Sequence, residues 1–174
     1  MGLALAAHSK AWEGPLLGDA TMPEVDPPDD PDSPQASMER DDPPAFLERM
    51  VMQHRLGPPP FSSAERGEVG GWLGIKDAER MDALAIAVLA DAWFPAPWPR
   101  LPEFAPAPTI DLTLHFRSPL PVDAELLLGR FTNSCVRDGF FEEDGELWAP
   151  DGTLVAQSRQ LGLLLGAKDP AGGR

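Results

Sequence analysis

The stretch MDALAIAVLADAW, residues 81–93, decides the fold, because it predicts a helix that is apolar on every side. Apolar residues at helical spacing form one face: Met81, Leu84, Ala85, Val88, Leu89 and Ala92. The opposite face carries small apolar residues, and a helix that is apolar all round belongs inside a core. We expect this helix to span about residues 79–92, with Asp77 able to cap its start and Pro95 ending it.

Asp91 is the residue that does not fit this buried helix. It lies in the last turn, where the helix dipole disfavours a carboxylate, on an element that should be buried. A local rule broken in this way suggests a functional site. The alternative is a carboxylate that simply reaches water at the helix end, and this stretch alone favours that alternative.

Six candidate strands surround the helix. They lie at residues 46–56, which also fit a helix, and at 67–76, 110–117, 122–136, 140–148 and 153–165. The last three form a meander, with a hairpin turn at Asp138-Gly139. An antiparallel sheet curled around one apolar helix buries that helix economically. We therefore predict an α+β protein with the hotdog fold, in which residues 45–166 form the domain.

The flanking segments have a different composition. Residues 1–14 hold at most one short residual strand, and residues 167–174 form a frayed tail. Residues 15–44 are rich in proline and in acidic side chains, and such a segment buries too little apolar surface to order itself. We expect it to be a disordered, extended linker.

The bulk properties exclude several classes of protein. The chain has 174 residues, enough for one domain plus extra segments, and its net charge of -14 argues against nucleic acid or an anionic membrane as partner. Cys135 is the only cysteine, so an internal disulfide is impossible and a cytoplasmic location is expected. We expect neither a secretory signal nor a membrane span. Abundant Arg, Ala, Pro and Gly hint at a GC-rich bacterial genome.

Most familiar catalytic motifs are missing from the sequence. It has no Gly-x-Ser-x-Gly elbow and no glycine-rich phosphate loop. His8, His54 and His115 lack the spacing of metal ligands, so we expect no metal and no cofactor. His115 falls on the polar face of its strand and is expected at the surface, whereas Cys135 is expected to be a plain thiol.

The last strand carries one further candidate. Gln160 and Arg159 point to opposite faces, and a neutral amide can face the helix at lower cost than a guanidinium. A buried Gln160 still needs hydrogen-bond partners. The alternative, favoured on this strand alone, is that it bonds only to backbone groups.

Four motifs occur together: LADAWFP at 89–95, PTIDLTLHF at 108–116, LWAPDGTLVA at 147–156 and QSRQL at 157–161. In this order and spacing they resemble the type II acyl-CoA thioesterase family, whose members are double hotdogs. The resemblance covers about residues 45–166, the second hotdog. It implies that residues 1–14 are the last strand of a first hotdog, that residues 15–44 are the interdomain crossover, and that most of the first hotdog is missing.

The resemblance also implies a site. In that family an Asp, a Thr and a Gln hold and polarise the attacking water, and the matching residues here are Asp91, Thr109 and Gln160. Asp91 would be the general base or the carboxylate that orients the water. Strand alternation, however, places Thr109 on the polar face with Asp111, so the strand entry must twist to bring it in.

The aromatic residues after the helix have two possible roles. Trp93, Phe94 and Trp98 could line an acyl channel, although core packing is the favoured role for most of them. A backbone N–H near the helix could stabilise the thioester oxyanion.

Three functions remain open at this point. The first is an acyl-CoA thioesterase, the second a non-catalytic hotdog that binds an acyl group or a partner chain, and the third an inactive fragment of a double-hotdog enzyme. The presence of both Asp91 and Gln160 favours an enzymatic origin. A lone hotdog has exposed strand edges, so we expect a homodimer or pairing with a second hotdog.

Overall fold

The structure is a computed structural model that describes residues 2–10, 13–15, 17–18, 20–30, 45–76, 78 and 80–166. Asp77, residues 31–44 and the tail at 167–174 lie outside this part, so the structure does not test the predictions about them. Residues 2–10 carry neither a helix nor a strand.

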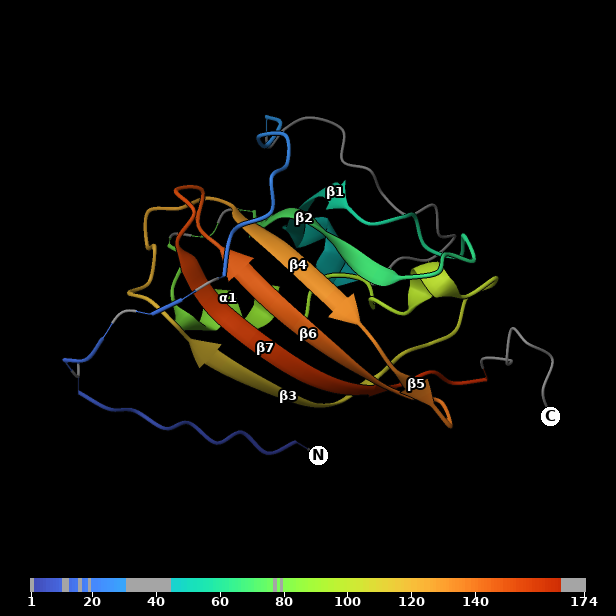
Figure 1. Cartoon of the computed structure of the whole chain (residues 1–174). Helices are drawn as coiled ribbons and strands as arrows, with labels where there is room; N and C mark the ends of the chain where they lie inside the picture. Colours follow the sequence, from blue (N-terminus) through green and yellow to red (C-terminus); the bar gives the residue numbers. More distant parts are fainter. Residues whose placement is uncertain are drawn as a thin grey trace.

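A seven-stranded antiparallel sheet forms the body of the protein, in the order β1-β2-β4-β6-β7-β3, with β5 paired to β6 (Figure 1). The strands are β1 (Met50–Leu56), β2 (Gly67–Ile75), β3 (Thr109–Phe116), β4 (Leu127–Asn133), β5 (Val136–Arg137), β6 (Phe140–Trp148) and β7 (Leu154–Leu163). The helix α1 (Ala83–Leu89) lies behind the sheet in Figure 1. The predicted α+β layout, a sheet curled around one helix, is confirmed.

Two local predictions are settled by the backbone. The ambiguous segment at 46–56 divides into a short 3-10 turn, η1 (Ala45–Arg49), and the strand β1, which pairs with β2. The hairpin between β5 and β6 turns at Asp138 and Gly139, whose φ angles are 53° and 83°. Positive φ at both central residues is what a two-residue hairpin turn of type I′ requires, and Asp-Gly supplies it.

The helix is shorter than predicted. Asp82, in extended conformation, is its N-cap and accepts hydrogen bonds at 2.9 Å from the backbone N–H groups of Leu84 and Ala85. The helix therefore starts after Asp82, whereas the predicted cap, Asp77, lies outside the described residues. Its C-cap is Ala90, so Asp91 lies just beyond the helix end.

The prediction that the helix is buried on every side is wrong. The side of α1 that carries Ala85, Ile86 and Leu89 packs onto the sheet, and Ile86 and Leu89 are fully buried. On the opposite side Leu84 is 78% exposed and Val88 is 49% exposed. Residues four and three apart share a helix face, so Leu84, Val88 and Asp91 form one uncovered stripe.

The main core lies between the helix and the concave face of the sheet. Its sheet residues include Val69, Leu73, Leu127, Phe131, Leu147 and Val155. They meet the buried side of α1 and the turn that follows it, so the helix end has a fixed position over β6 and β7.

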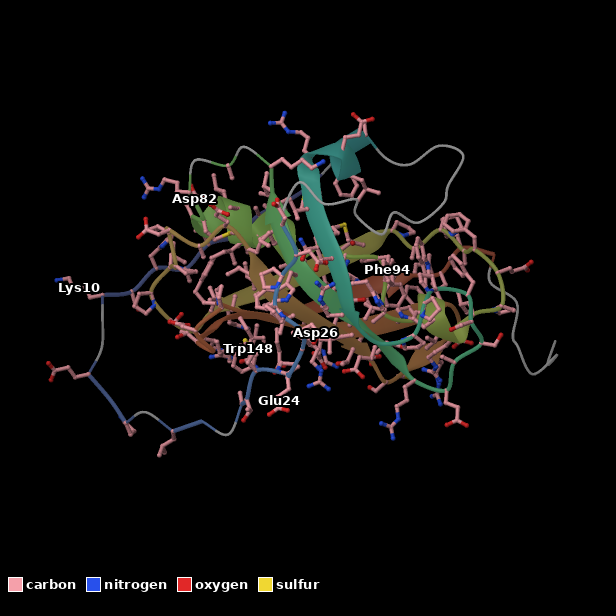
Figure 2. All side chains as sticks on the ribbon, turned by 90° about the horizontal axis from the view of Figure 1, so that it is seen from above. Lys10, Glu24, Asp26, Asp82, Phe94 and Trp148 are labelled. Carbon is pink, nitrogen blue, oxygen red and sulfur yellow. The ribbon has the colours of Figure 1, made fainter. Side chains whose placement is uncertain are left out.

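A second apolar cluster lies on the outer face of the sheet, and an acidic segment covers it. The cluster contains Trp72, Leu128 and Trp148, with Met22 and Val25 packed against it. Figure 2 marks Glu24, Asp26 and Trp148 where the segment crosses this part of the sheet. Residues 20–30 therefore cover apolar surface and form part of the folded domain.

Polar contacts fix this segment to β1 and β2. Trp72 Nε1 donates to the Asp26 carbonyl at 2.9 Å. The buried Gln53 side chain accepts from the Asp29 N–H at 2.8 Å and donates to the Asp29 carbonyl at 3.0 Å. Arg55 adds an ion pair to the Asp29 carboxylate at 2.8 Å. Within the predicted linker, residues 20–30 are thus an ordered strap across the sheet.

Candidate functional site

Asp91, Thr109 and Gln160 meet at one point of the structure. Gln160 Nε2 donates to Asp91 Oδ1 at 2.8 Å, and Thr109 Oγ1 donates to the same oxygen at 3.1 Å. Gln160 Nε2 also donates to Thr109 Oγ1. The three predicted residues, from the end of α1, the start of β3 and the middle of β7, therefore form one hydrogen-bonded cluster.

A β-bulge brings Thr109 into this cluster. In the β3–β7 ladder Thr109 pairs with Gly162 and Asp111 pairs with Leu161, with a register shift between Thr109 and Asp111. One extra residue in a strand reverses the side on which the preceding side chains point. The shift places Thr109 on the helix side with Gln160. This bulge is the distortion of the strand entry that was needed to bring Thr109 to the site.

The cluster is open on one side. Gln160 is only 8% exposed, whereas Asp91 and Thr109 are exposed, so Asp91 reaches water at the helix end, the alternative that its own stretch favoured. Both hydrogen bonds to Asp91 end on Oδ1. Its second oxygen can therefore accept from a water molecule, a chemistry suited to a general base.

Apolar surface borders the open side of the cluster. Leu84 and Val88 lead along the uncovered stripe of α1 to Asp91, and Ile110, which follows Thr109 at the bulge, is 52% exposed. A carboxylate at the end of an uncovered apolar face can hold a polar reacting group beside an apolar chain.

Sequence reasoning missed one buried carboxyl group beside the cluster. Glu143 of β6 pairs in register with Gln160 of β7, is 6% exposed, and accepts from the Ala96 N–H at 2.6 Å through Oε2. Burial, the largest cause, and the charges of Asp91 and Asp144 together raise the pKa of Glu143 to about 7, against the lowering effect of the Ala96 hydrogen bond.

A sequence signal for Glu143 did exist. Alternation along residues 140–148 places Glu143 on the same face as Phe141 and Leu147, which are both buried. A charged residue on an apolar strand face is as unusual as the Asp at the helix end.

The aromatic residues after the helix form a stacked layer. His54 stacks on Trp93 and Phe94 at ring-centroid distances of 6.5 and 6.3 Å, and Phe94 stacks on Trp98 at 6.4 Å. Trp93 and Trp98 are buried. Core packing, the favoured alternative, therefore describes these two residues. Burial, and then the charge of Arg55, lower the pKa of His54 below 6.5.

The described residues contain no group of three His, Cys, Asp or Glu side chains placed to hold a metal ion. Within the same part of the chain, no helix is long and apolar enough to cross a membrane. His115 is exposed, as predicted, and Cys135 is an exposed thiol.

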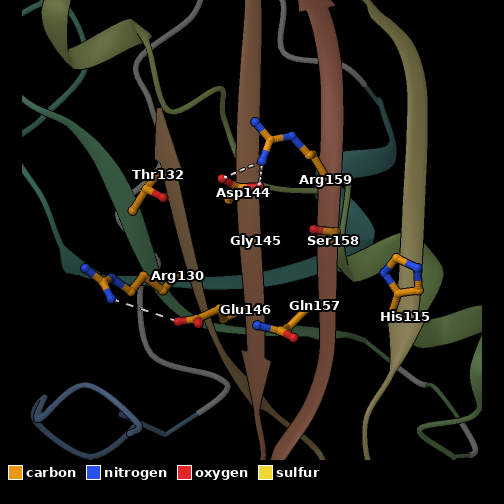
Figure 3. Close-up of a pocket in the computed structure, with 9 residues that line it drawn as sticks. All are labelled: His115, Arg130, Thr132, Asp144, Gly145, Glu146, Gln157, Ser158 and Arg159. Carbon is orange, nitrogen blue, oxygen red and sulfur yellow. Dashed lines mark hydrogen bonds and ion pairs between the residues drawn. The ribbon is translucent and has the colours of Figure 1, made fainter. Parts of the chain in front are cut away.

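A polar hollow of about 470 Å³ lies on the outer face of the sheet (Figure 3). It is lined by His115, Arg130, Thr132, Asp144, Gly145, Glu146, Gln157, Ser158 and Arg159. Its charges are paired, with Arg159 at 3.1 Å from Asp144 and Arg130 at 3.9 Å from Glu146. Alternation places these charged side chains on the face opposite Gln160, so the hollow is separate from the cluster.

Known proteins identify the family. A family model described as the acyl-CoA thioesterase C-terminal domain matches residues 23–164, which include most of the strap. No curated protein matches the chain.

Several solved structures are similar. A protein of unknown function with a hotdog fold from Alicyclobacillus acidocaldarius gives a TM-score of 0.74 at 23% identity, covering 94% of this chain and 59% of its own. The acyl-CoA thioesterase II TesB2 from Mycobacterium marinum gives 0.62 at 22% identity, covering 92% and 60%. A candidate thioesterase II from Thermobifida fusca gives 0.54 at 28% identity, covering 78% and 57%. The predicted hotdog fold is confirmed, and the chain spans less than two thirds of the length of these proteins.

Proposed function

Because the chain belongs to the family of acyl-CoA thioesterase C-terminal domains, we propose that it hydrolyses acyl-CoA thioesters with a water molecule held by Asp91, Thr109 and Gln160. The observation that carries the proposal is the hydrogen bonding of all three side chains to one another. These are the residues that the family resemblance implies.

The chemistry follows from the orientation of the Asp91 carboxylate. Gln160 and Thr109 hold its Oδ1, and its Oδ2 takes a proton from water as that water attacks the thioester carbonyl carbon. The C–S bond then breaks, and the proton passes to the departing thiolate, giving a carboxylic acid and free coenzyme A. No covalent intermediate on the enzyme is needed.

The acyl chain would lie on the apolar surface beside Asp91. Leu84, Val88 and Ile110 are exposed there in the single chain, and a second hotdog packed over them would bury both the acyl chain and these side chains. Among the described strands, β3 pairs only with β7 and has one unpaired edge. Pairing of that edge with a second copy, or with another hotdog, would complete the site.

Thiol release from a panel of medium-chain and aromatic acyl-CoAs tests the proposed reaction. We expect slow hydrolysis above the buffer rate. A folded protein that releases no thiol from any of them would overturn the catalytic proposal.

A non-catalytic acyl-binding hotdog is the second candidate, and the solvent exposure of Asp91 and Thr109 favours it. A non-hydrolysable acyl-CoA thioether separates the two functions. Binding of the thioether without turnover of the matching thioester would assign the binding role. The exposed thiol of Cys135 fits a reducing compartment, and a cytoplasmic location stays a prediction.

A further inference from the structure

We propose that Glu143 is a positioning residue of this site, which holds the turn at residues 91–96 through the Ala96 N–H and thereby fixes Asp91 against Gln160. The kinetic effect expected from this role rests on the proposed function, the hydrolysis of acyl-CoA. The structural part of the role, the coupling between Glu143 and the cluster, can be measured without any activity.

The turn is attached to the sheet at two neighbouring points. At its start, Asp91 Oδ1 accepts from Gln160 Nε2 of β7 at 2.8 Å. At its end, the Ala96 N–H donates to Glu143 Oε2 of β6 at 2.6 Å. Glu143 and Gln160 are register partners, so the two attachments lie side by side on adjacent strands.

Water cannot replace the second attachment. Ala96 is fully buried and Glu143 nearly so, and a buried N–H that loses its acceptor costs about 1–3 kcal/mol. The turn would have to move to satisfy this N–H. Because the turn begins at Asp91, such a movement would displace the carboxylate from Gln160 and Thr109.

Charge makes this attachment sensitive to protonation. Hydrogen bonds to an ionised acceptor are shorter and stronger than neutral ones, and the 2.6 Å bond from Ala96 is short. The negative charges of Asp91 and of Asp144, the next residue along β6, both favour the protonated form of Glu143. With a pKa near 7, Glu143 changes its charge, and hence its hold on Ala96, close to neutral pH.

Two other groups near the turn have to be separated from Glu143. His54 stacks under Trp93 and Phe94 of the same turn and titrates below 6.5. Arg100, the second group, donates to Asn133 Oδ1 of β4 at 3.2 Å. A His54→Gln control therefore separates the titration of His54 from that of Glu143.

Kinetics form the first arm of the experiment, with Glu143→Leu, Glu143→Gln and the control Glu142→Gln. Glu142 is next to Glu143, but its side chain points to the other face and bonds to Ser134 and Cys135. We expect Glu143→Leu to lower kcat about 10- to 100-fold with little change in KM, because small misplacements of catalytic groups cost rates of this size. Glu143→Gln should recover most of kcat, since its amide oxygen can still accept from Ala96. An unchanged kcat in a folded Glu143→Leu protein would overturn the proposal.

NMR forms the second arm and needs no activity. In the wild type and in His54→Gln, we expect the Ala96 backbone N–H and the Gln160 side-chain NH2 signals to shift with a midpoint near pH 7, and this step should vanish in Glu143→Gln. Asp91→Asn removes a charge that raises the pKa of Glu143, so the midpoint should move to lower pH. If the pH dependence of the Gln160 side-chain signal is the same in the wild type, in Glu143→Gln and in Asp91→Asn, the positioning role is overturned. An inactive wild type with these couplings present would instead refute only the proposed hydrolysis.

Discussion

Thr109 lies on the same side of the sheet as Gln160, although strict alternation from Asp111 would place it on the opposite side. The register shift between Thr109 and Asp111 makes the difference, and it brings the Thr109 hydroxyl to 3.1 Å from Asp91 Oδ1. A single extra residue in an edge strand thus completes the cluster. Bulges are frequent beside functional sites for this reason.

Thr109→Val tests the role of this hydroxyl while keeping the shape of the side chain. Loss of one hydrogen bond to the Asp91 carboxylate should lower kcat about 10- to 150-fold, since hydrogen bonds to charged groups contribute about 1.5–3 kcal/mol. Thr113→Val is the matched control, because Thr113 lies on the outer face of the same strand. Equal kcat values for the two variants would show that the Thr109 hydroxyl has no role in catalysis.

Asp91→Asn is the direct test of the general base. Asn keeps the shape but cannot take a proton from water, so kcat should fall about 100- to 10,000-fold. Asp91 is exposed, and stability to urea should therefore change little. Turnover that survives this substitution in a folded protein would refute the assigned role.

The sequence predicted the sheet, the helix and the three cluster residues for different reasons. Strong apolar periodicity located the elements, and the meander followed from alternation and the Asp138-Gly139 turn. The family resemblance, rather than any spacing, pointed to Thr109. Its bulge could not be foreseen, because bulges depend on how two strands pair and not on the pattern within one strand.

Burial was the part that the sequence predicted worst. Leu84 and Val88 are as apolar as core residues, yet no described segment covers them, because the side of α1 with Ile86 and Leu89 packs onto the sheet instead. The reverse happened in the acidic stretch. Met22 and Val25 are too few to predict order, but they pack against an outer apolar cluster that only the folded sheet creates.

Glu143 should make the protein less stable as pH rises toward neutrality. Its pKa is about 7 in the folded protein and near 4.5 in the unfolded chain, so between these values the folded state holds the extra proton. Stability therefore falls with rising pH across this window, by about 3 kcal/mol in total for this group.

Glu143→Gln should lack this part of the pH dependence. Urea denaturation of both proteins from pH 4.5 to 7.5 measures it as the difference between their slopes. Glu142→Gln, in which the buried carboxyl is intact, should follow the wild-type curve in the same window. Parallel curves for the wild type and Glu143→Gln would show that Glu143 does not hold its proton in the folded state.

Gln53→Ala should release the strap at residues 20–30. It removes both hydrogen bonds to the Asp29 backbone, and the expected loss of stability is about 1–3 kcal/mol, measured by urea denaturation. Gln157→Ala is the control, because Gln157 lies on the outer face of β7 and accepts an exposed hydrogen bond from Arg117. Equal losses in the two variants would mean that the strap contributes no stability.

Assembly is expected to depend on the uncovered side of α1. Leu84 and Val88 form an apolar stripe that ends at Asp91, and a two-fold pairing through β3 would cover it. Val88→Asp places a charge in this contact and should convert a dimer into a monomer in sedimentation velocity runs at several concentrations. Val136→Asp, which places the same charge on the exposed strand β5, should leave the dimer intact.

Because an acyl site closed by a second hotdog needs that partner, the Val88→Asp monomer should also lose most of its thioesterase activity. A wild-type protein that stays monomeric at high concentration and still hydrolyses acyl-CoA would refute both the pairing and the need for it.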